Sequence, residues 1–345
     1  MKVAMLSPIA WRTPPRNYGP WEKVASVLTE GLIDAGIDVT LFATADSITN
    51  GKLDAVCPAA YEEDKSIEPK VWECLHISNL MEKANKFDII HNHFDFLPLT
   101  YSSLIGTPMV TTIHGFSSER ILPVYKKYNS KTHFISISNA DRHRDLDYLT
   151  TIYHGISSVD FDYSNTRENY LLFYGRIHQD KGAHTAIEIA KKCGIPLIIA
   201  GLVQDQGYFN REVAPHIDDK QVKYLGNVRQ KEGNILLGKA KALLHPIYFE
   251  EPFGLSVAEA MMCGTPVIAH ARGSMPELIE DGKTGYLVNT ANEAMQAVRR
   301  IDEINPYYCR AHAIETFGIE RMVQSYIKAY KKMLDATKWN RTKGF

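Results

Sequence analysis

Two glutamates flank a segment with the features of an anion-binding helix start. Glu251 and Glu259 stand eight positions apart, and the residues between them open a helix after an apolar run. The first N–H groups of a helix carry partial positive charge, so the amides of Phe253, Gly254 and Leu255 suit a phosphate oxygen. Because phosphate repels a carboxylate, we expect each glutamate to accept hydrogen bonds from neutral hydroxyls, Glu251 from a sugar and Glu259 from a ribose.

A purely structural interpretation of the same glutamates is also open. Ser256 and Glu259 have the S-x-x-E spacing that is typical of a capping box, which needs no ligand. Glu251 would then be an ordinary loop acid. From the residues alone, both interpretations stand.

A pair of cations follows an earlier apolar run. Arg176 and Lys181 lie in LLFYGRIHQDKGA, between a predicted strand and the start of a predicted helix. Two fixed cations beside a helix start can stabilise the negative charge that grows on a departing diphosphate. The alternative is an Arg and a Lys exposed on a loop, and we expect His178 and Asp180 in that loop to be solvated.

Parallel sheets must position these side chains, because short apolar runs alternate with amphipathic stretches in two successive series. A polar, turn-rich linker at 157–168 separates the series and predicts domains at 1–160 and 166–320. The expected fold is therefore α/β, with two Rossmann-like, doubly wound domains facing a cleft, and ligands beyond the carboxyl ends of the strands. The predicted strands cover 2–9, 38–44, 88–93, 108–115, 133–138 and 149–155, then 170–177, 196–201, 222–228, 242–247 and 266–271, and two predicted helices cover 21–35 and 69–85.

Composition excludes several classes of protein. The chain has 345 residues, of which 45% are hydrophobic and 23% charged, as in globular enzymes rather than disordered or fibrous chains. A net charge of −1 argues against nucleic acid as a partner. Five widely spaced cysteines without a C-x-x-C pair indicate neither a disulfide framework nor a zinc site. The N-terminus lacks the pattern of a signal peptide, so we expect a cytoplasmic protein.

The end of the chain is basic. Residues 321–345 contain many Lys and Arg residues and a single acid, Asp335, and apolar positions at helical spacing predict a helix over about 321–338. We expect this helix to return to the acidic N-terminal domain. Contact with an anionic membrane is the less favoured alternative.

The segment E-PFG-LSVAEAM-x-x-GTPV, with its E-x7-E spacing, resembles the signature of retaining glycosyltransferase family 4 and its GT-B relatives. The resemblance extends over nearly the whole chain. It implies that Glu251 contacts hydroxyls of the transferred sugar and Glu259 the ribose, while the amides between them hold the distal phosphate. It also implies that Arg176 and Lys181 grip the pyrophosphate.

In the first domain the resemblance implies two further donor contacts. Family members carry two adjacent glycines after the first strand, whose amides contact the donor phosphate; here Gly19 matches, but Pro20 replaces the second glycine and removes an N–H. His114 ends another strand, where the family has a histidine near the transferred sugar. The nearby tryptophans, Trp11 and Trp21, could shape an acceptor pocket or simply pack.

The nucleotide side of the resemblance rests on weaker matches. Asn227 and Val228 end a strand where the family uses backbone groups to read the base, and Gly201 would let the backbone pass close to a ligand. Ser274 and Glu277 form a second S-x-x-E pattern beside the sugar or phosphate.

Metal binding is not expected. His91 and His93 form an H-x-H pattern, but apart from Asp95 no third ligand follows at suitable spacing. The resemblance implies that the protein's own cations replace a metal, so no cofactor is expected. The role of His154 is left open.

Together these features predict a metal-independent, retaining transferase that moves a hexose from a nucleotide-sugar, with UDP as the expected nucleotide, to a small or soluble acceptor. Three alternatives remain: a nucleotide-sugar-binding protein without turnover, a GT-B phosphorylase or epimerase, and a peripheral-membrane enzyme with a lipid acceptor.

Overall fold

The computed structural model of the chain describes residues 1–116 and 118–342, with side chains as far as Asp335. Two parallel sheets carry the fold, one of seven strands and one of six. The expected α/β class with two Rossmann-like sheets is therefore confirmed. Every described strand pair in both sheets is parallel, so helical crossovers must connect the strands and cover the sheets.

The chain divides into two compact units, which are described separately. The first unit consists of Met1–Gly155 together with the chain from Ile319 onward, and the second of Ile156–Gly318. The division thus falls just before the polar linker that the sequence suggests, and the end of the chain belongs to the first unit.

The sheet of the first unit has the order β3-β2-β1-β4-β5-β6-β7. Its central strands are buried on both faces, as expected for strands covered by helices on both sides. The order of the strands reverses between β1 and β4, and open α/β sheets bind their ligands beyond such a reversal. The strands are β1 (Lys2–Leu6), β2 (Asp38–Phe42), β3 (Lys52–Asp54), β4 (Ile89–Asn92), β5 (Met109–Ile113), β6 (His133–Ser136) and β7 (Tyr148–Thr151).

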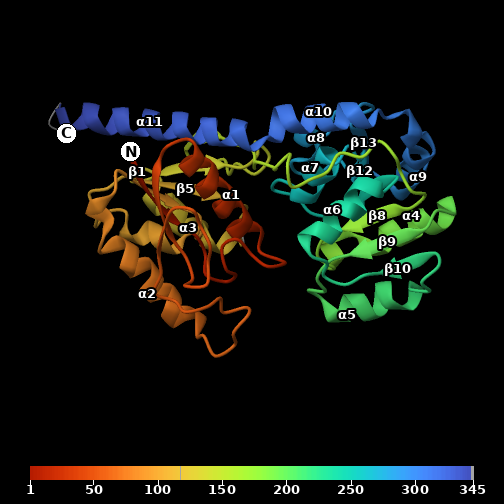
Figure 1. The fold of residues 1–345 in the computed structure, drawn as a ribbon, viewed down its shortest axis with the longest axis horizontal. Helices are drawn as coiled ribbons and strands as arrows, with labels where there is room; N and C mark the ends of the chain where they lie inside the picture. The colour runs from red at the N-terminus through yellow and green to blue at the C-terminus, as the bar shows by residue number, and fades with distance from the viewer. Residues whose placement is uncertain (117, 343–345) are drawn as a thin grey trace. The chain divides into compact units, whose positions relative to one another are not determined.

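Helices cover both faces of this sheet. On one face α2 and α3 contribute to a core cluster with Leu6, Phe42 and Phe134. On the other face α1 and α11 pack side by side over Met5, Val110 and their neighbours (Figure 1). These helices are α1 (Pro20–Asp34), α2 (Pro69–Met81), α3 (Leu122–Tyr128) and α11 (Ile319–Thr342), with short 3-10 turns at Ala84–Lys86, Leu97–Tyr101 and Glu119–Ile121.

The long helix α11 joins the first unit through its apolar face. Tyr326 and Tyr330 are fully buried in the core cluster that it shares with α1. Lys328, Lys331 and Lys332 on its other face are exposed and form no ion pair within the described part of the chain. Burial of apolar surface, rather than charge, holds the helix in place.

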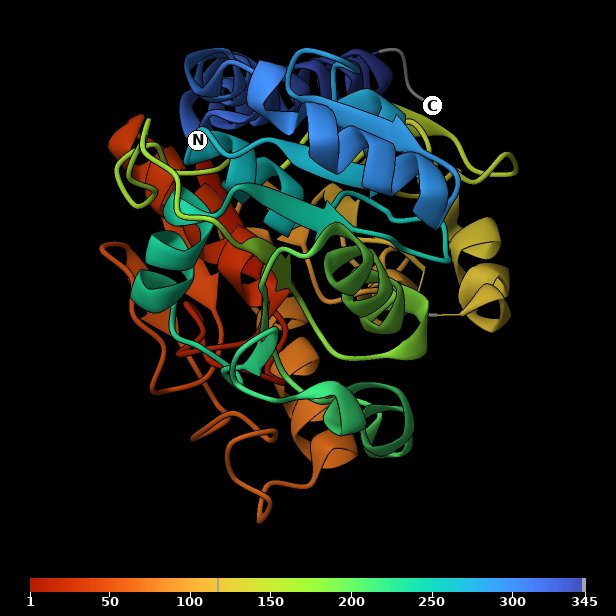
Figure 2. The ribbon, with the colours of Figure 1, turned by 90° about the vertical axis from the view of Figure 1, so that its right-hand side faces the viewer.

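The sheet of the second unit has the order β10-β9-β8-β11-β12-β13, so its reversal lies between β8 and β11. Figure 2 shows the strands and helices of this unit in green to blue. Its helices include two packed pairs, α4 with α9 and α7 with α10. The strands are β8 (Leu171–Tyr174), β9 (Leu197–Ala200), β10 (Val222–Tyr224), β11 (Ala242–His245), β12 (Val267–His270) and β13 (Gly285–Val288). The helices are α4 (Ala183–Cys193), α5 (Gln206–Tyr208), α6 (Gln230–Lys239), α7 (Leu255–Met262), α8 (Met275–Leu278), α9 (Ala291–Arg300) and α10 (Pro306–Phe317), with a π turn at Phe209–Val213 and 3-10 turns at Gln179–Lys181, Ala214–His216 and Ile301–Glu303.

Candidate functional site

The loops after β8 and β11 meet at the reversal of the second sheet. The two strands are neighbours, and the N–H of Tyr248 donates to the carbonyl of Asp180 at 2.7 Å. Gly182, with φ +73°, lies so close to the second loop that a Cβ there would come within 2.1 Å of the carbonyl oxygen of Pro246. Glycine at this position therefore allows the loop that carries Arg176 and Lys181 to lie against the loop that carries Glu251.

Lys181 and Glu251 form a buried ion pair. The ammonium donates to Oε2 of Glu251, and the two side chains keep only 15% and 11% of their exposure. His245, the last residue of β11, is also buried, and its Nε2 lies 3.3 Å from the same carboxylate oxygen. The structure thus brings together two of the predicted site residues and adds His245, which sequence reasoning missed although it directly precedes the loop.

The ion pair keeps Glu251 ionised. Burial by itself would raise the pKa of Glu251, but the positive charge of Lys181 and the neighbouring His245 outweigh burial and lower this pKa to about 2. Burial is also the main reason why the pKa of His245 is lowered. At neutral pH the pair therefore consists of a carboxylate and an ammonium beside a neutral imidazole, so Glu251 only accepts hydrogen bonds.

Arg176 lies in the same loop as Lys181 and is held by two side chains. Its guanidinium donates to Asp180 at 2.9 Å and to Gln204 at 2.6 Å. The expectation that Asp180 is solvated is therefore wrong, because Asp180 orients Arg176. The centre of the Phe249 ring lies 4.5 Å from the Lys181 ammonium and 5.9 Å from the Arg176 guanidinium, so one aromatic ring lies near both cations.

The helix start after Glu251 is open. Gly254 is the N-cap of α7, with φ +91° and no side-chain cap. Within residues 1–116 and 118–342, the N–H groups of Gly254 and Leu255 have no hydrogen-bond acceptor. The capping box suggested for Ser256 and Glu259 is wrong, because Ser256 is already the second residue of the helix.

A second loop braces this helix start. Ser274 donates its N–H to the carbonyl of Glu251 at 2.9 Å and its hydroxyl to the carbonyl of Phe253 at 2.6 Å. At Gly273, with φ +55°, a Cβ would lie 2.3 Å from the N atom of Glu251, so only glycine fits. The predicted capping box of Ser274 with Glu277 does not form through the serine hydroxyl, which holds the site loop instead.

The other residues predicted to bind the nucleotide come from other elements of the second unit and make no contact with the Lys181–Glu251 ion pair in the described contacts. Glu259 is buried in α7. Gly201 follows β9, but its close approach is to the carbonyl of Gly175, where a Cβ would come within 1.8 Å, so the fold itself requires this glycine. Asn227 and Val228 follow β10, where Asn227 is exposed and Val228 half-buried.

In the first unit, the loop after β1 ends at a strained glycine. Gly19 has φ +148° and caps α1, whose first residue is Pro20. Proline suits this position, since the first N–H of a helix has no partner within it. Glu22 follows in the first turn, is 3% exposed, and accepts the N–H of Trp11 at 3.2 Å. Burial raises the pKa of Glu22 to about 7, although the backbone hydrogen bonds from its own N–H and from Trp11 oppose this.

Replacing Glu22 with glutamine is expected to stabilise the first unit at pH 8 by about 3 kcal/mol. The folded pKa lies above the unfolded value of 4.5, so the carboxyl costs no stability below pH 4.5 and an increasing amount as pH rises to about 7. The gain of Glu22→Gln should therefore vanish near pH 4.5. Tryptophan fluorescence during urea unfolding measures the free energy of unfolding of the first unit selectively, because the second unit, Ile156–Gly318, contains no tryptophan. Equal gains at pH 8 and pH 4.5, or the same gain from the exposed Glu62→Gln, would contradict the assignment.

His114 lies just after β5 and is nine-tenths buried. Its ring stacks on Trp21 and on His154, and its Nε2 is hydrogen-bonded to Nδ1 of His93 at 2.8 Å. In the part of the chain that the structure describes, no group of three or more His, Cys, Asp or Glu residues has the geometry of a metal site. His154, whose role the sequence left open, stacks against His114.

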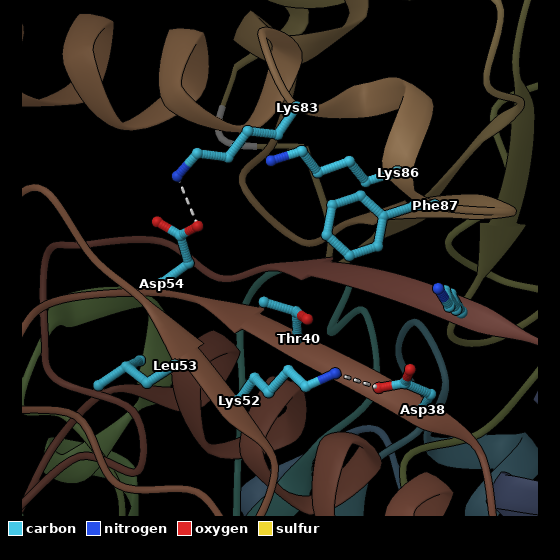
Figure 3. A pocket seen from close by; sticks show the side chains of 9 residues that line it. Asp38, Thr40, Lys52, Leu53, Asp54, Lys83, Lys86 and Phe87 are labelled. Atoms are coloured by element: carbon cyan, nitrogen blue, oxygen red, sulfur yellow. Dashed lines mark hydrogen bonds and ion pairs between the residues drawn. The ribbon is translucent and has the colours of Figure 1, made fainter.

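A separate hollow of about 530 Å³ lies in the first unit (Figure 3). Lys2, Asp38 and Lys52 are the first residues of β1, β2 and β3, so the hollow lies at the amino ends of these strands, away from the edge where the predicted site residues lie. Ion pairs join Lys52 to Asp38 and Lys83 to Asp54. The hollow is lined by Lys2, Asp38, Thr40, Lys52, Leu53, Asp54, Lys83, Lys86 and Phe87.

The fold and the second-unit site together define a class of protein. A buried carboxylate, two cations and open helix amides at the reversal of a Rossmann-like sheet favour a ligand that carries both phosphate and hydroxyl groups. The family profiles agree with this class. The profile described as Glycosyl transferases group 1 matches residues 160–306, and the one described as Glycosyltransferase Family 4 matches residues 22–156. The chain belongs to these glycosyltransferases.

Individual proteins similar to this chain have the same fold or family. O-antigen chain mannosyltransferase C of Escherichia coli is 22% identical over 366 residues, covering 93% of this chain and 96% of that protein. Sucrose-phosphate synthase from Thermosynechococcus elongatus has a TM-score of 0.77 at 20% identity, covering 97% and 100%. Anabaena HepE, solved with UDP-glucose, has a TM-score of 0.70 at 18% identity, covering 97% and 100%. These solved glycosyltransferases confirm the GT-B fold.

Among the described residues, no helix is both long and apolar enough to cross a membrane.

Proposed function

We propose that the chain is a retaining, metal-independent hexosyltransferase that uses a UDP-sugar and a small or soluble acceptor in the cytoplasm. The observation that carries this proposal is the buried Lys181–Glu251 pair beside the open N–H groups of Gly254 and Leu255. The UDP-glucose bound by HepE, a protein of the same fold, favours UDP as the nucleotide.

The ion pair gives each partner a role when the donor binds. The distal phosphate replaces Glu251 as the partner of Lys181 and accepts the N–H groups of Gly254 and Leu255. Glu251, freed from Lys181, accepts hydrogen bonds from hydroxyls of the sugar. Arg176, oriented by Asp180, stabilises the second phosphate.

The proposed transfer proceeds on one face of the sugar. The bond from the anomeric carbon to the phosphate oxygen breaks as the acceptor oxygen forms its bond to the same carbon from that face, which retains the configuration. The departing phosphate oxygen takes the acceptor proton. Arg176 and Lys181 supply the positive charge that a divalent metal supplies in other enzymes. The same proposal includes further donor contacts, made by Glu259, His114, Gly19, Asn227 and Val228.

Calorimetric titration in EDTA tests the proposal. UDP, GDP and ADP, each with its sugar conjugates, are titrated into the wild type and into Arg176→Ala. We expect one nucleotide to bind without metal and to lose roughly ten- to a hundredfold in affinity in Arg176→Ala, because a charge-assisted contact is removed. The matched control is Arg211→Ala, an exposed arginine of the same unit, which should bind like the wild type.

The outcomes separate the alternatives. If none of the nucleotides binds, the proposed function is wrong. Binding without transfer to any acceptor would indicate a nucleotide-sugar-binding protein, and consumption of free phosphate or isomerisation of the donor would indicate a phosphorylase or epimerase. If transfer requires liposomes, the acceptor is a lipid. Where transfer occurs, the coupling constant of the anomeric proton in the product tests retention.

A further inference from the structure

One buried histidine of the second unit has no role in the transfer proposed above. His245 is the last residue of β11, and its side chain keeps only 6% of its exposure. Its Nε2 is buried and makes no well-aligned hydrogen bond among the described residues, although Oε2 of Glu251 lies 3.3 Å away. A buried polar atom without a hydrogen bond costs stability, so this nitrogen needs a partner that the free protein supplies only in part.

The charges around His245 decide which of its nitrogens carries the proton. Burial is the main cause that lowers the pKa of His245, so at neutral pH the ring is uncharged and has one N–H and one lone pair. The carboxylate of Glu251 is ionised and only accepts hydrogen bonds. A lone pair on Nε2 would face the lone pairs of Oε2, so Nε2 carries the proton and points it at Glu251.

The two carboxylate oxygens of Glu251 have different surroundings. Oε2 accepts the ammonium of Lys181 and lies beside Nε2 of His245. Oε1 accepts no hydrogen bond from any residue that the structure describes. The backbone of Glu251 is fixed as well, because Ser274 donates its N–H to the Glu251 carbonyl at 2.9 Å. A carboxylate held through one oxygen keeps the other oxygen available in a fixed direction.

Binding of the donor would change the partners of this carboxylate. When the distal phosphate takes Lys181, Oε2 loses its ammonium, and Nε2–H of His245 is the donor that already lies beside it. The separation of 3.3 Å exceeds the usual range of about 2.7 to 3.2 Å for a hydrogen bond between nitrogen and oxygen, so this contact can shorten. A buried carboxylate without a donor is strongly unfavourable, which favours the shorter contact.

We propose that His245 is a positioning residue, whose Nε2–H takes over Oε2 of Glu251 when the donor phosphate takes Lys181 and so holds Oε1 toward the hydroxyls of the transferred sugar. The inference rests on the proposed function for its ligand. The orientation of the His245 N–H toward Glu251 in the free protein does not depend on that ligand, and both residues belong to the second unit.

Two substitutions of equal length separate positioning from simple packing. His245→Gln keeps an N–H donor near the place of Nε2, whereas His245→Met fills similar space without a donor. Calorimetric titration in EDTA measures the affinity of each full-length variant for UDP, and the same two substitutions are titrated again in the Glu251→Gln background. A thermal melt of each variant establishes that it is folded before the titration.

We expect His245→Met to weaken UDP binding roughly tenfold, because the displaced carboxylate is left without a donor, and His245→Gln to stay within about threefold of the wild type. In the Glu251→Gln background no charge is displaced, so His245→Met should change the affinity by less than about twofold. A packing role would weaken binding equally in both variants, or equally in both backgrounds, and either result would overturn the inference.

Long-range proton–nitrogen NMR of the histidine rings in the full-length protein supplies a test that needs no ligand, with His245→Gln identifying the signals of His245. We expect the Nε2–H tautomer in the free protein and a downfield movement of this proton when UDP saturates the site. The Nδ1–H tautomer would overturn the inference. If UDP binds and the proton does not move, the exchange of partners is wrong while the proposed function stands. If no nucleotide binds, both are wrong.

Discussion

Replacing Lys181 with alanine is expected to lower kcat/KM for sugar transfer by roughly 100- to 1,000-fold. Lys181 is the cation that pairs with the buried carboxylate of Glu251, so its loss removes charge from where the leaving phosphate is proposed to lie. Transfer assays in EDTA with the nucleotide-sugar identified by calorimetry measure the effect. Lys192→Ala is the matched control, because Lys192 is an exposed lysine on α4, and it should leave kcat/KM unchanged.

The same variant should also be less stable at neutral pH. Glu251 would keep a buried charge without its cation, a loss of roughly 3 to 5 kcal/mol when one partner of a buried pair is removed. In the wild type the folded pKa of about 2 lies below the unfolded 4.5, so the stability from this group is present above pH 4.5 and is lost as pH falls toward 2. Amide hydrogen exchange of β8 and β11 would measure this difference in stability between Lys181→Ala and the wild type. Unchanged stability and activity in Lys181→Ala would contradict the role of the pair.

Replacing Glu251 with glutamine is expected to lower kcat by roughly 100-fold or more, while UDP alone binds at least as tightly as to the wild type because the phosphate no longer displaces a carboxylate from Lys181. Glutamine keeps the shape of the side chain but loses the charge that accepts sugar hydroxyls. UDP has no sugar beyond its phosphates, so its binding should depend on Arg176, Lys181 and the α7 amides instead. Comparing UDP with its sugar conjugate in the same calorimetric titration separates these contributions.

The neighbouring glutamate provides the control for this prediction. Glu250→Gln changes an exposed side chain that accepts the N–H of Gly273 at 2.5 Å and lies beside Glu251 in sequence. We expect its kcat to stay within a few-fold of the wild type. If Glu250→Gln lost activity and Glu251→Gln kept it, the assignment of Glu251 as the first glutamate of the E-x7-E motif would be wrong.

Most of the fold could be predicted from hydrophobic pattern alone. Buried strands such as β1, β4 and β5 were recognisable as apolar runs, and α7 could be placed after Gly254 and before a glycine and a proline. The edge strands β3 and β13 were not predicted. Lys52 and Leu53 of β3 are exposed, so this strand lacks an apolar run and leaves a weak pattern. β13 begins at Gly285, directly after a polar segment that is typical of a turn.

Sequence reasoning named the individual residues of the candidate site but not the contact between Lys181 and Glu251. Sequence reasoning assigned separate ligands to Lys181 and Glu251, because nothing signals a contact between residues 70 positions apart. Only the adjacency of β8 and β11 brings them together. Glu22 was missed for a similar reason, since an acid in the first turn of a helix is common and nothing in the sequence shows that Trp11 folds over it.

The histidine pattern was visible in the sequence, but the contacts of its two histidines were not. His91 and His93 suggested a metal only because they are two positions apart, a spacing that also puts both on one face of a strand. Their actual partners, Tyr330 and His114, come from α11 and β5. Contacts with such distant parts of the chain depend on sheet register, which no local pattern encodes.

The most direct test of the central claim is an amide NMR spectrum of the second-unit site with and without UDP, in EDTA. If the diphosphate binds at the start of α7, the N–H signals of Gly254 and Leu255 should move strongly downfield with UDP and stay in place with uridine, because only the phosphate supplies a new acceptor. The account would be contradicted if UDP bound and these two amides did not move, while signals elsewhere did.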